Sequence, residues 1–290
     1  MFSWIIFGTV SLIGILGNGL IIAVNGHKWL QNKKMVPCDF LLTCLSTSRF
    51  LTQLTILVNS LLYNFFQQTT SPIYSEDLIY IFWMLFNMVS HWCATWLSVF
   101  YCVKVTNFAN PFFLWMKARI NVLTPRMLGM SIGVSMVFYL SSLISLFEHK
   151  KCCNVTETLP GNDSQNVVFV PLELSCSSIN FCLSTTASIL LLTSLQRHTR
   201  NLKKSGLGAK DLSTQIHIKV MTSLLFCLFF YLFYFIGMII STKNNYAETD
   251  ELLVDILLSL FPSAHSVILI LTNPKLKEMS ARILNIRHRT

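Results

Sequence analysis

Seven long apolar stretches constrain this chain more than any other feature of its sequence. A helix needs roughly 20 mostly apolar residues to cross the hydrocarbon core of a bilayer. Charged residues make up only 12% of the 290 residues, against about 25% in a soluble domain. The sequence therefore predicts an all-α membrane protein, a single seven-transmembrane helix bundle with spans at about 2–24, 40–62, 78–103, 127–147, 171–195, 220–241 and 252–272, followed by a basic tail at 273–290.

Lysine and arginine set the predicted orientation of this bundle. Basic residues accumulate in the short loops on the cytoplasmic side of a membrane protein. Most of the 22 lysines and arginines fall after the first, third and fifth spans or in the tail, and acidic residues gather at the opposite ends. We therefore expect the N-terminus outside and the C-terminus inside a multi-pass protein of the plasma membrane. The net charge of +9 is then a topology signal, and nucleic-acid binding is not expected.

The segment between the fourth and fifth spans is the longest loop expected on the outside. It contains two Asn-x-Ser/Thr sequons, at Asn154 and Asn162. Glycosylation is expected in such a loop, and we favour Asn154. Cys152, Cys153 and Cys176 lie in or near the same loop, where the environment is oxidising. A disulfide there stays open, because pairing cannot be read from sequence.

No catalytic signature occurs in the chain. It has no phosphate-binding glycine-rich loop, no nucleophile elbow and no His-Glu-x-x-His motif, so neither enzymatic activity nor a cofactor or metal is expected. An ion path usually needs several acids within the bilayer, and Asp255 is the only acid expected well inside a span. What remains is an outward-facing polar site above a basic cytoplasmic face, which is the layout of a signalling receptor.

Motifs spread over nearly the whole chain are more specific than this layout. The third span ends in ATWLSVFYCVKVTNF, the fifth in SLQRHTRN, and the seventh reads PSAHSVILILTNPKLK. GNGLII, FLWMKARI and STQIHIK add shorter matches, and the Asp-Arg-Tyr of rhodopsin-like receptors is absent. Together these motifs resemble those of the type 2 taste receptors, the bitter taste receptor family of G-protein-coupled receptors.

The resemblance implies a function and a set of partners. Such a receptor binds small bitter compounds in an extracellular-facing pocket and activates a gustducin-like heterotrimeric G protein. Membrane lipids would also contact it, and a receptor oligomer stays open. A vomeronasal-type or other chemosensory receptor is the main alternative, and a small-molecule transporter or channel is the second.

The predicted ligand site lies on the third and neighbouring spans. Trp83 and Asn87 are four residues apart and share one face of a helix, which His91 continues one turn deeper. Tryptophan can stack on ligands and attract amines, and the resemblance implies agonist contacts at Trp83 and Asn87. Tyr234 and Asp255 complete the set, Asp255 favouring cationic ligands. Core packing for the third-span residues, a lipid-facing ring for Tyr234 and a solvated helix end for Asp255 stay open as alternatives.

Arg49 is the most demanding residue of the second span. A guanidinium in mid-span costs at least about 2.5–3.5 kcal/mol, so it must point inward and find acceptors. We expect Arg49 to tie spans one, two and seven together as a structural lock. We expect the activation switch to comprise Arg49, Asn18, Tyr234 and Ser266. The resemblance places Tyr234 below the ligand. The expected partners of Arg49 are Asn18 in the first span and the seventh-span serines Ser259, Ser263 and Ser266.

The cytoplasmic ends of the spans form a basic rim that suits anionic lipid headgroups and a G protein. After Asn273, apolar residues Leu276, Met279 and Ile283 share one face, which predicts a short interfacial helix. The residues expected to contact the G protein are Lys104, Lys117, Arg119, Arg200, His217 and Lys219.

Overall fold

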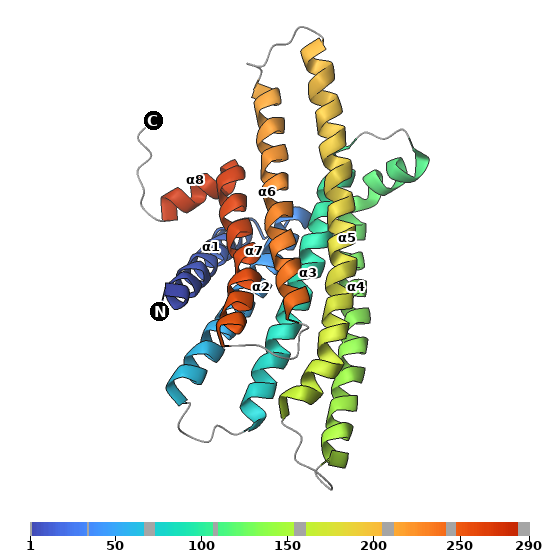
Figure 1. Cartoon of the computed structure of the whole chain (residues 1–290). Helices are drawn as coiled ribbons and strands as arrows, with labels where there is room; N and C mark the ends of the chain where they lie inside the picture. The colour runs from blue at the N-terminus through green and yellow to red at the C-terminus, as the bar shows by residue number, and fades with distance from the viewer. Residues whose placement is uncertain are drawn as a thin grey trace.

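The computed structural model describes residues 2–33, 35–66, 73–106, 110–153, 161–204, 212–241 and 248–283. The described residues form eight helices, with consecutive long helices running in opposite directions (Figure 1). The end of α2, the start of α3, the end of α4 and the start of α5 all lie at the lower end of that view. The helices are α1 (Phe2–Asn32), α2 (Pro37–Phe66), α3 (Ile73–Val105), α4 (Pro111–Cys153), α5 (Gly161–Lys204), α6 (Leu212–Ile240), α7 (Glu248–Thr272) and α8 (Pro274–Ile283).

Each predicted span falls on one of the helices α1 to α7, although most of these helices extend beyond it. The largest extensions are in α4, which has 43 residues, and α5, which has 44. The limits of the membrane-embedded segments themselves stay predictions. Among the described residues, five segments are long and apolar enough to cross a bilayer: Ser3–Asn32, Pro37–Asn59, Pro111–Ser141, Pro171–Arg197 and Leu252–Thr272. Helix α6 has a shorter apolar segment, Leu225–Ile240.

Helix α3 is absent from those five segments because polar residues interrupt its apolar sequence. Asn87, Ser90, His91 and Thr95 are all buried. The helix is central to the bundle and contacts α2, α4 and α5. Its polar side chains therefore face other helices rather than lipid, as expected for polar groups at membrane depth.

Proline and asparagine fix where several helices begin. Proline is favoured at the first helical position because it lacks an N–H that would be unpaired there. Before α4, Asn110 Oδ1 accepts a hydrogen bond from the backbone N of Phe112 at 2.9 Å, the geometry of a helix cap. The helices that begin with proline are α2, α4 and α8, at Pro37, Pro111 and Pro274.

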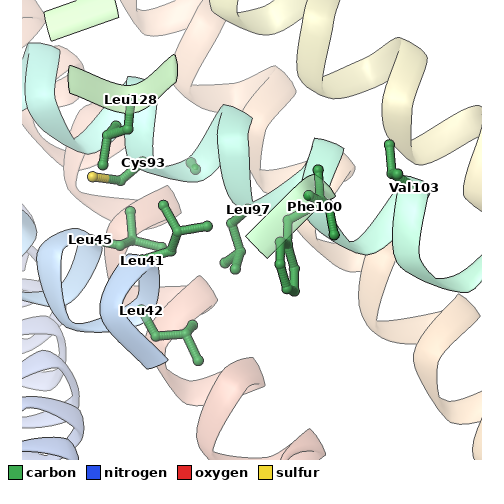
Figure 2. Close-up of a cluster of buried hydrophobic side chains, with 10 residues drawn as sticks. Leu41, Leu42, Leu45, Cys93, Leu97, Phe100, Val103 and Leu128 are labelled. Atoms are coloured by element: carbon green, nitrogen blue, oxygen red, sulfur yellow. The ribbon is translucent and has the colours of Figure 1, made fainter. Parts of the chain in front are cut away.

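Among the described residues, the largest buried apolar cluster lies where α2, α3 and α4 meet. Leu41, Leu42 and Leu45 of α2 pack against side chains of α3, with Leu128 of α4 completing the cluster (Figure 2). On the outer surface the pattern reverses: Leu16 and Met130 are 70% and 65% exposed. An apolar exterior around a partly polar interior is suited to lipid as the solvent.

Helix α8 confirms that the tail folds into a short helix. Leu276 is buried and packs with Ile21 and Val24 of α1, and Met279 lies against the same cluster. The predicted apolar face of this helix therefore covers α1. Its position at a membrane interface stays a prediction.

Candidate ligand site and switch residues

The predicted face of α3 points into the bundle. Asn87 is 6% exposed and His91 4%. Trp83 is half-buried and packs with two groups of side chains, one containing Tyr234 and the other containing Tyr139. Trp83 Nε1 is buried without a hydrogen-bond partner. One face of α3 thus carries a broad aromatic surface, an amide and an imidazole on successive turns.

Asn87 lies at the centre of a group of four hydrogen-bonded side chains from three helices. Its Nδ2 donates to Glu173 Oε1 of α5 at 2.7 Å and to the Tyr234 hydroxyl of α6 at 2.7 Å. The same hydroxyl lies 2.8 Å from His91 Nε2. Because it accepts from Asn87, it can donate to His91. We call Asn87, His91, Glu173 and Tyr234 the Asn87 cluster.

Tyr234 faces the interior and not lipid. Its side chain is 2% exposed, and its ring lies in a T-shaped contact with His91 at 4.8 Å between centroids. The lipid-facing alternative is therefore wrong, and the expectation that a buried phenol finds a partner is confirmed. The neighbouring Tyr231 stacks on Phe261 of α7 at 4.7 Å, with its hydroxyl 3.5 Å from His91 Nδ1.

Glu173 is the member of the cluster that the sequence prediction missed. It is 4% exposed, so this acid, at the edge of the predicted fifth span, points into the bundle, which the sequence did not lead us to expect. The predicted fifth span begins only two residues before Glu173, which made it look like an outer helix end. In the structure α5 begins ten residues earlier than that prediction, at Gly161. A signal did exist: polar residues recur at helical spacing along one buried face of α5, namely Glu173, Ser177, Asn180, Ser184 and Ser188.

Asp255 lies on α7 close to this region. The residue before it, Val254, packs with Tyr231 and Tyr234, and Asp255 itself is half-buried. The structure therefore brings Trp83, Asn87, His91 and Tyr234 together and places Asp255 at their margin.

Arg49 is 1% exposed and points inward as predicted, but its partners differ from those expected. Its Nε donates to Ser90 Oγ at 3.2 Å, its Nη1 lies 2.7 Å from His265 Nδ1, and the guanidinium lies 4.7 Å from the Phe261 ring centroid. A guanidinium can only donate, so His265 Nδ1 accepts and its proton sits on Nε2. Arg49 thus joins α2 to α3 and α7. The expected bonds to the residues Asn18, Ser259, Ser263 and Ser266 were wrong.

The link between the first, second and seventh spans comes one turn later, from Gln53. Its Nε2 donates to Ser263 Oγ at 2.7 Å, and Ser263 Oγ donates to the backbone carbonyl of Val10 at 2.9 Å. The three helices that Arg49 was expected to join are therefore connected by a neutral amide and a hydroxyl. Sequence composition gave no reason to prefer Gln53 over the charged residue four positions earlier.

Asn18 and Ser266 are fully buried but bond to their own helices. Asn18 Nδ2 donates to the Gly14 carbonyl and Ser266 Oγ to the Ser263 carbonyl, both at 2.8 Å. A Cβ added to Gly17 would lie 2.5 Å from Ser266 Oγ. Helices α1 and α7 therefore approach closely because Gly17 has no side chain. The switch role of Asn18 and Ser266 stays a prediction.

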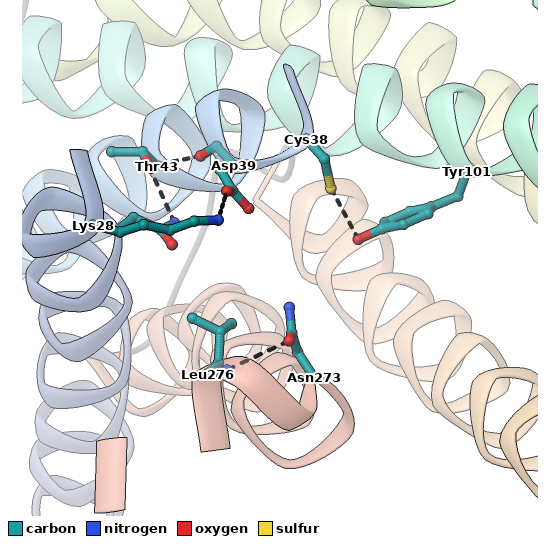
Figure 3. A network of polar contacts seen from close by, with 8 residues as sticks. Lys28, Cys38, Asp39, Thr43, Tyr101, Asn273 and Leu276 are labelled. Carbon is teal, nitrogen blue, oxygen red and sulfur yellow. Dashed lines mark hydrogen bonds and ion pairs between the residues drawn. The ribbon is translucent and has the colours of Figure 1, made fainter. Parts of the chain in front are cut away.

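The basic ends of the helices are held together by contacts between α1, α2 and α3 (Figure 3). Lys28 of α1 pairs with Asp39 of α2, and Cys38 Sγ of α2 lies 3.2 Å from the Tyr101 hydroxyl of α3. Lys117 Nζ of α4 donates to the Thr106 carbonyl at 3.1 Å. The helix termini that carry basic residues thus lie together at one end of the bundle, as the predicted orientation requires.

The predicted G-protein contacts are only partly described. Lys104, Arg119 and Arg200 are exposed and Lys117 is half-buried. Asn154 and the side chains of His217 and Lys219 lie outside the described residues, as do the side chains of Asn162, Cys152 and Cys153. Cys176 carries a free thiol.

These features define a multi-pass membrane protein of receptor type, with an apolar exterior, a buried polar cluster and one basic end. The chain matches the model of the family described as Taste receptor protein (TAS2R) over residues 1–288. It is 33% identical to Taste receptor type 2 member 7 of Mus musculus, over 94% of this chain and 91% of that protein. It is 34% identical to Taste receptor type 2 member 8 of Pongo pygmaeus over 94% and 92%, and 34% identical to member 119 of Rattus norvegicus over 96% and 83%.

The chain belongs to the type 2 taste receptor family. This confirms the resemblance drawn from the motifs and the expected seven-span, all-helical fold. Members of this family are signalling receptors that bind ligands and couple to G proteins, and they are not enzymes. The assignment favours a taste receptor over a vomeronasal receptor, a transporter or a channel.

Proposed function

We propose that this chain is a bitter taste receptor of the plasma membrane that binds small bitter compounds beside the Asn87 cluster. The observation that carries the proposal is the hydrogen-bonded connection of α3, α5 and α6 through Asn87, Glu173 and Tyr234. A ligand that contacts Trp83 and Asn87 competes for the Asn87 donors. It therefore acts on the positions of α5 and α6 as well as on α3.

Activation is a shift in population between two arrangements of the bundle. A ligand favours whichever arrangement it binds better. Tyr234 transmits the change, because its hydroxyl bonds both to Asn87 and to His91. When a ligand takes the Asn87 amide, the Tyr234 ring loses one partner and can turn, and α6 moves with it.

Arg49 provides the rigid part of the bundle in this proposal. It holds α2 to α3 through Ser90 and to α7 through His265. Helices α5 and α6 make no hydrogen bond to Arg49 among the described residues. They can therefore open inward against a fixed frame of α2, α3 and α7, and Arg49 acts as a lock rather than as a ligand contact.

The opened end receives a gustducin-like heterotrimeric G protein. Lys104, Arg119 and Arg200 are exposed at the ends of α3, α4 and α5 and can meet acidic groups of that protein. His217 and Lys219 belong to the same proposed surface, with Lys117 at its edge. Anionic lipid headgroups occupy this rim when no G protein is bound. Association of two receptor molecules can be tested in the same cells.

The proposal is tested by expressing the chain with a gustducin-type chimeric G protein and recording calcium during a screen of bitter compounds. We expect a response that is lost in Trp83→Ala and Asn87→Ala at equal surface expression. Asn25→Ala is the matched control, because Asn25 is also buried but bonds to Thr43 at the basic end.

The three results separate the parts of the proposal. Loss in the two site variants but not in Asn25→Ala supports both the function and the site. A wild-type response that survives both site variants retains the receptor and rejects the site. Silence of the wild type across the panel, with surface expression shown, rejects bitter compounds as its ligands.

A further inference from the structure

Glu173 is a buried carboxyl group without a cationic partner in the described part of the chain. The ion pairs found there are Lys28 with Asp39 and Arg282 with Glu278. The buried guanidinium of Arg49 bonds to Ser90 and His265 instead. Glu173 receives a hydrogen bond from the neutral Asn87 amide at 2.7 Å. An isolated buried carboxylate is costly unless it is paired with a positive charge.

Aromatic side chains pack against the part of α5 that carries this carboxyl group. Leu172, the residue before Glu173, and Cys176, one turn after Leu172, pack in one cluster with Tyr80, Trp83 and Tyr139. The rings of Tyr80 and Trp83 lie 5.7 Å apart at 34°. Trp83 also reaches the group that contains Tyr234, and its Nε1 is buried with no partner. Aromatic rings attract cations through their faces, most strongly when water is excluded.

We infer that Glu173 and Trp83 form a subsite for the ammonium group of cationic ligands, both protonated amines and quaternary ammonium compounds. This inference rests on the proposed function and specifies the class of ligand. The ammonium supplies the positive charge that Glu173 lacks, and the indole face of Trp83 adds a cation–π contact. Asp255 is only half-buried, so solvent screens its charge more than that of Glu173.

The geometry also connects this charge to activation. Glu173 Oε1 and the Tyr234 hydroxyl share the two N–H groups of Asn87 Nδ2. An ammonium that takes over Glu173 releases one of these N–H groups. The balance of hydrogen bonds at Tyr234 then changes without direct contact between the ligand and Tyr234.

The test compares Glu173→Gln with Asp255→Asn in cells that express equal amounts of receptor at the surface. Glutamine retains an oxygen acceptor for Asn87 and replaces the ionisable oxygen with an uncharged NH2 group. The probes are denatonium, which is permanently cationic, and salicin, a neutral glucoside. We expect Glu173→Gln to raise the half-maximal concentration of denatonium by a factor at least ten times larger than the factor for salicin. Equal shifts for both probes, or a larger loss of denatonium response in Asp255→Asn, would overturn the inference.

A binding measurement separates this inference from the proposed function. Thermal unfolding of the purified receptor in detergent is followed with and without denatonium. If denatonium stabilises the wild type but not Glu173→Gln, the cation subsite is supported. If, in addition, no compound triggers nucleotide exchange, the proposed function is rejected while the cation subsite stands. Signalling by salicin without any stabilisation or response with denatonium would retain the receptor and reject the cation subsite.

Discussion

Removing the hydroxyl of Tyr234 tests the connection between the ligand site and α6. In Tyr234→Phe the ring stays but the 2.7 Å bond from Asn87 and the 2.8 Å contact with His91 are lost. Interhelical hydrogen bonds in membranes contribute about 0.6 kcal/mol on average and up to about 1.7. Losing two therefore costs about 1–3 kcal/mol, which corresponds to roughly 5–150-fold in an equilibrium between two arrangements.

The loss also frees the Asn87 amide, which a ligand can then take without competition from Tyr234. We expect Tyr234→Phe to lower the unfolding temperature of the purified receptor, to raise the calcium signal without agonist and to lower the half-maximal agonist concentration at least fivefold. The matched control is Tyr231→Phe, whose hydroxyl lies 3.5 Å from His91 Nδ1, at the limit of a hydrogen bond. Equal behaviour of the two variants, in unfolding and in calcium response, would refute this reasoning.

Three further predictions concern the frame of the bundle and its outer loop. Arg49→Met leaves the acceptors of two buried partners unpaired at about 1–3 kcal/mol each, so we expect a lower unfolding temperature and less receptor at the cell surface by antibody labelling. Gly17→Ala places a methyl group 2.5 Å from Ser266 Oγ and should cost about 1–3 kcal/mol, whereas Gly8→Ala meets nothing within 4 Å and should leave thermal unfolding unchanged or slightly improved. Asn154→Gln should reduce the glycosidase-sensitive mass of the mature receptor, and an unchanged mass would exclude that sequon as a glycosylation site.

The fold follows from the sequence because a bilayer leaves few alternatives. A chain with seven apolar stretches must satisfy its backbone within each crossing segment, so helices are the expected solution. What the apolar pattern does not mark is where a helix continues into a polar environment. α5 begins at Gly161 and α4 continues to Cys153, although hydropathy limits the predicted spans to 171–195 and 127–147. A helix can continue past its apolar segment because its backbone hydrogen bonds also form in the polar environment beyond the hydrocarbon core.

The ligand site could be predicted where its residues lie on one helix and not where they lie on several. Trp83, Asn87 and His91 follow from helical spacing alone. Glu173 is brought to Asn87 by the packing of α5 on α3, a pairing between residues 86 positions apart. Burial of Arg49 was predictable from its cost in lipid, but the choice of Ser90 and His265 as acceptors depends on how α3 and α7 are rotated. Periodicity within one segment carries no information on that rotation.

The buried guanidinium of Arg49 and the buried carboxyl group of Glu173 are hydrogen-bonded to neutral groups rather than to each other. Arg49 uses an imidazole and a hydroxyl, and Glu173 uses an amide. A direct ion pair in a low-dielectric interior would have to be broken, at several kcal/mol, whenever the helices moved apart. Hydrogen bonds to neutral side chains exchange partners at lower cost. Because His91 and Ser90 are adjacent on α3, Tyr234 bonds to α3 one residue from the frame against which α6 moves. In the proposed mechanism this low cost of exchange keeps the two arrangements close enough in energy for a small molecule to shift the population between them.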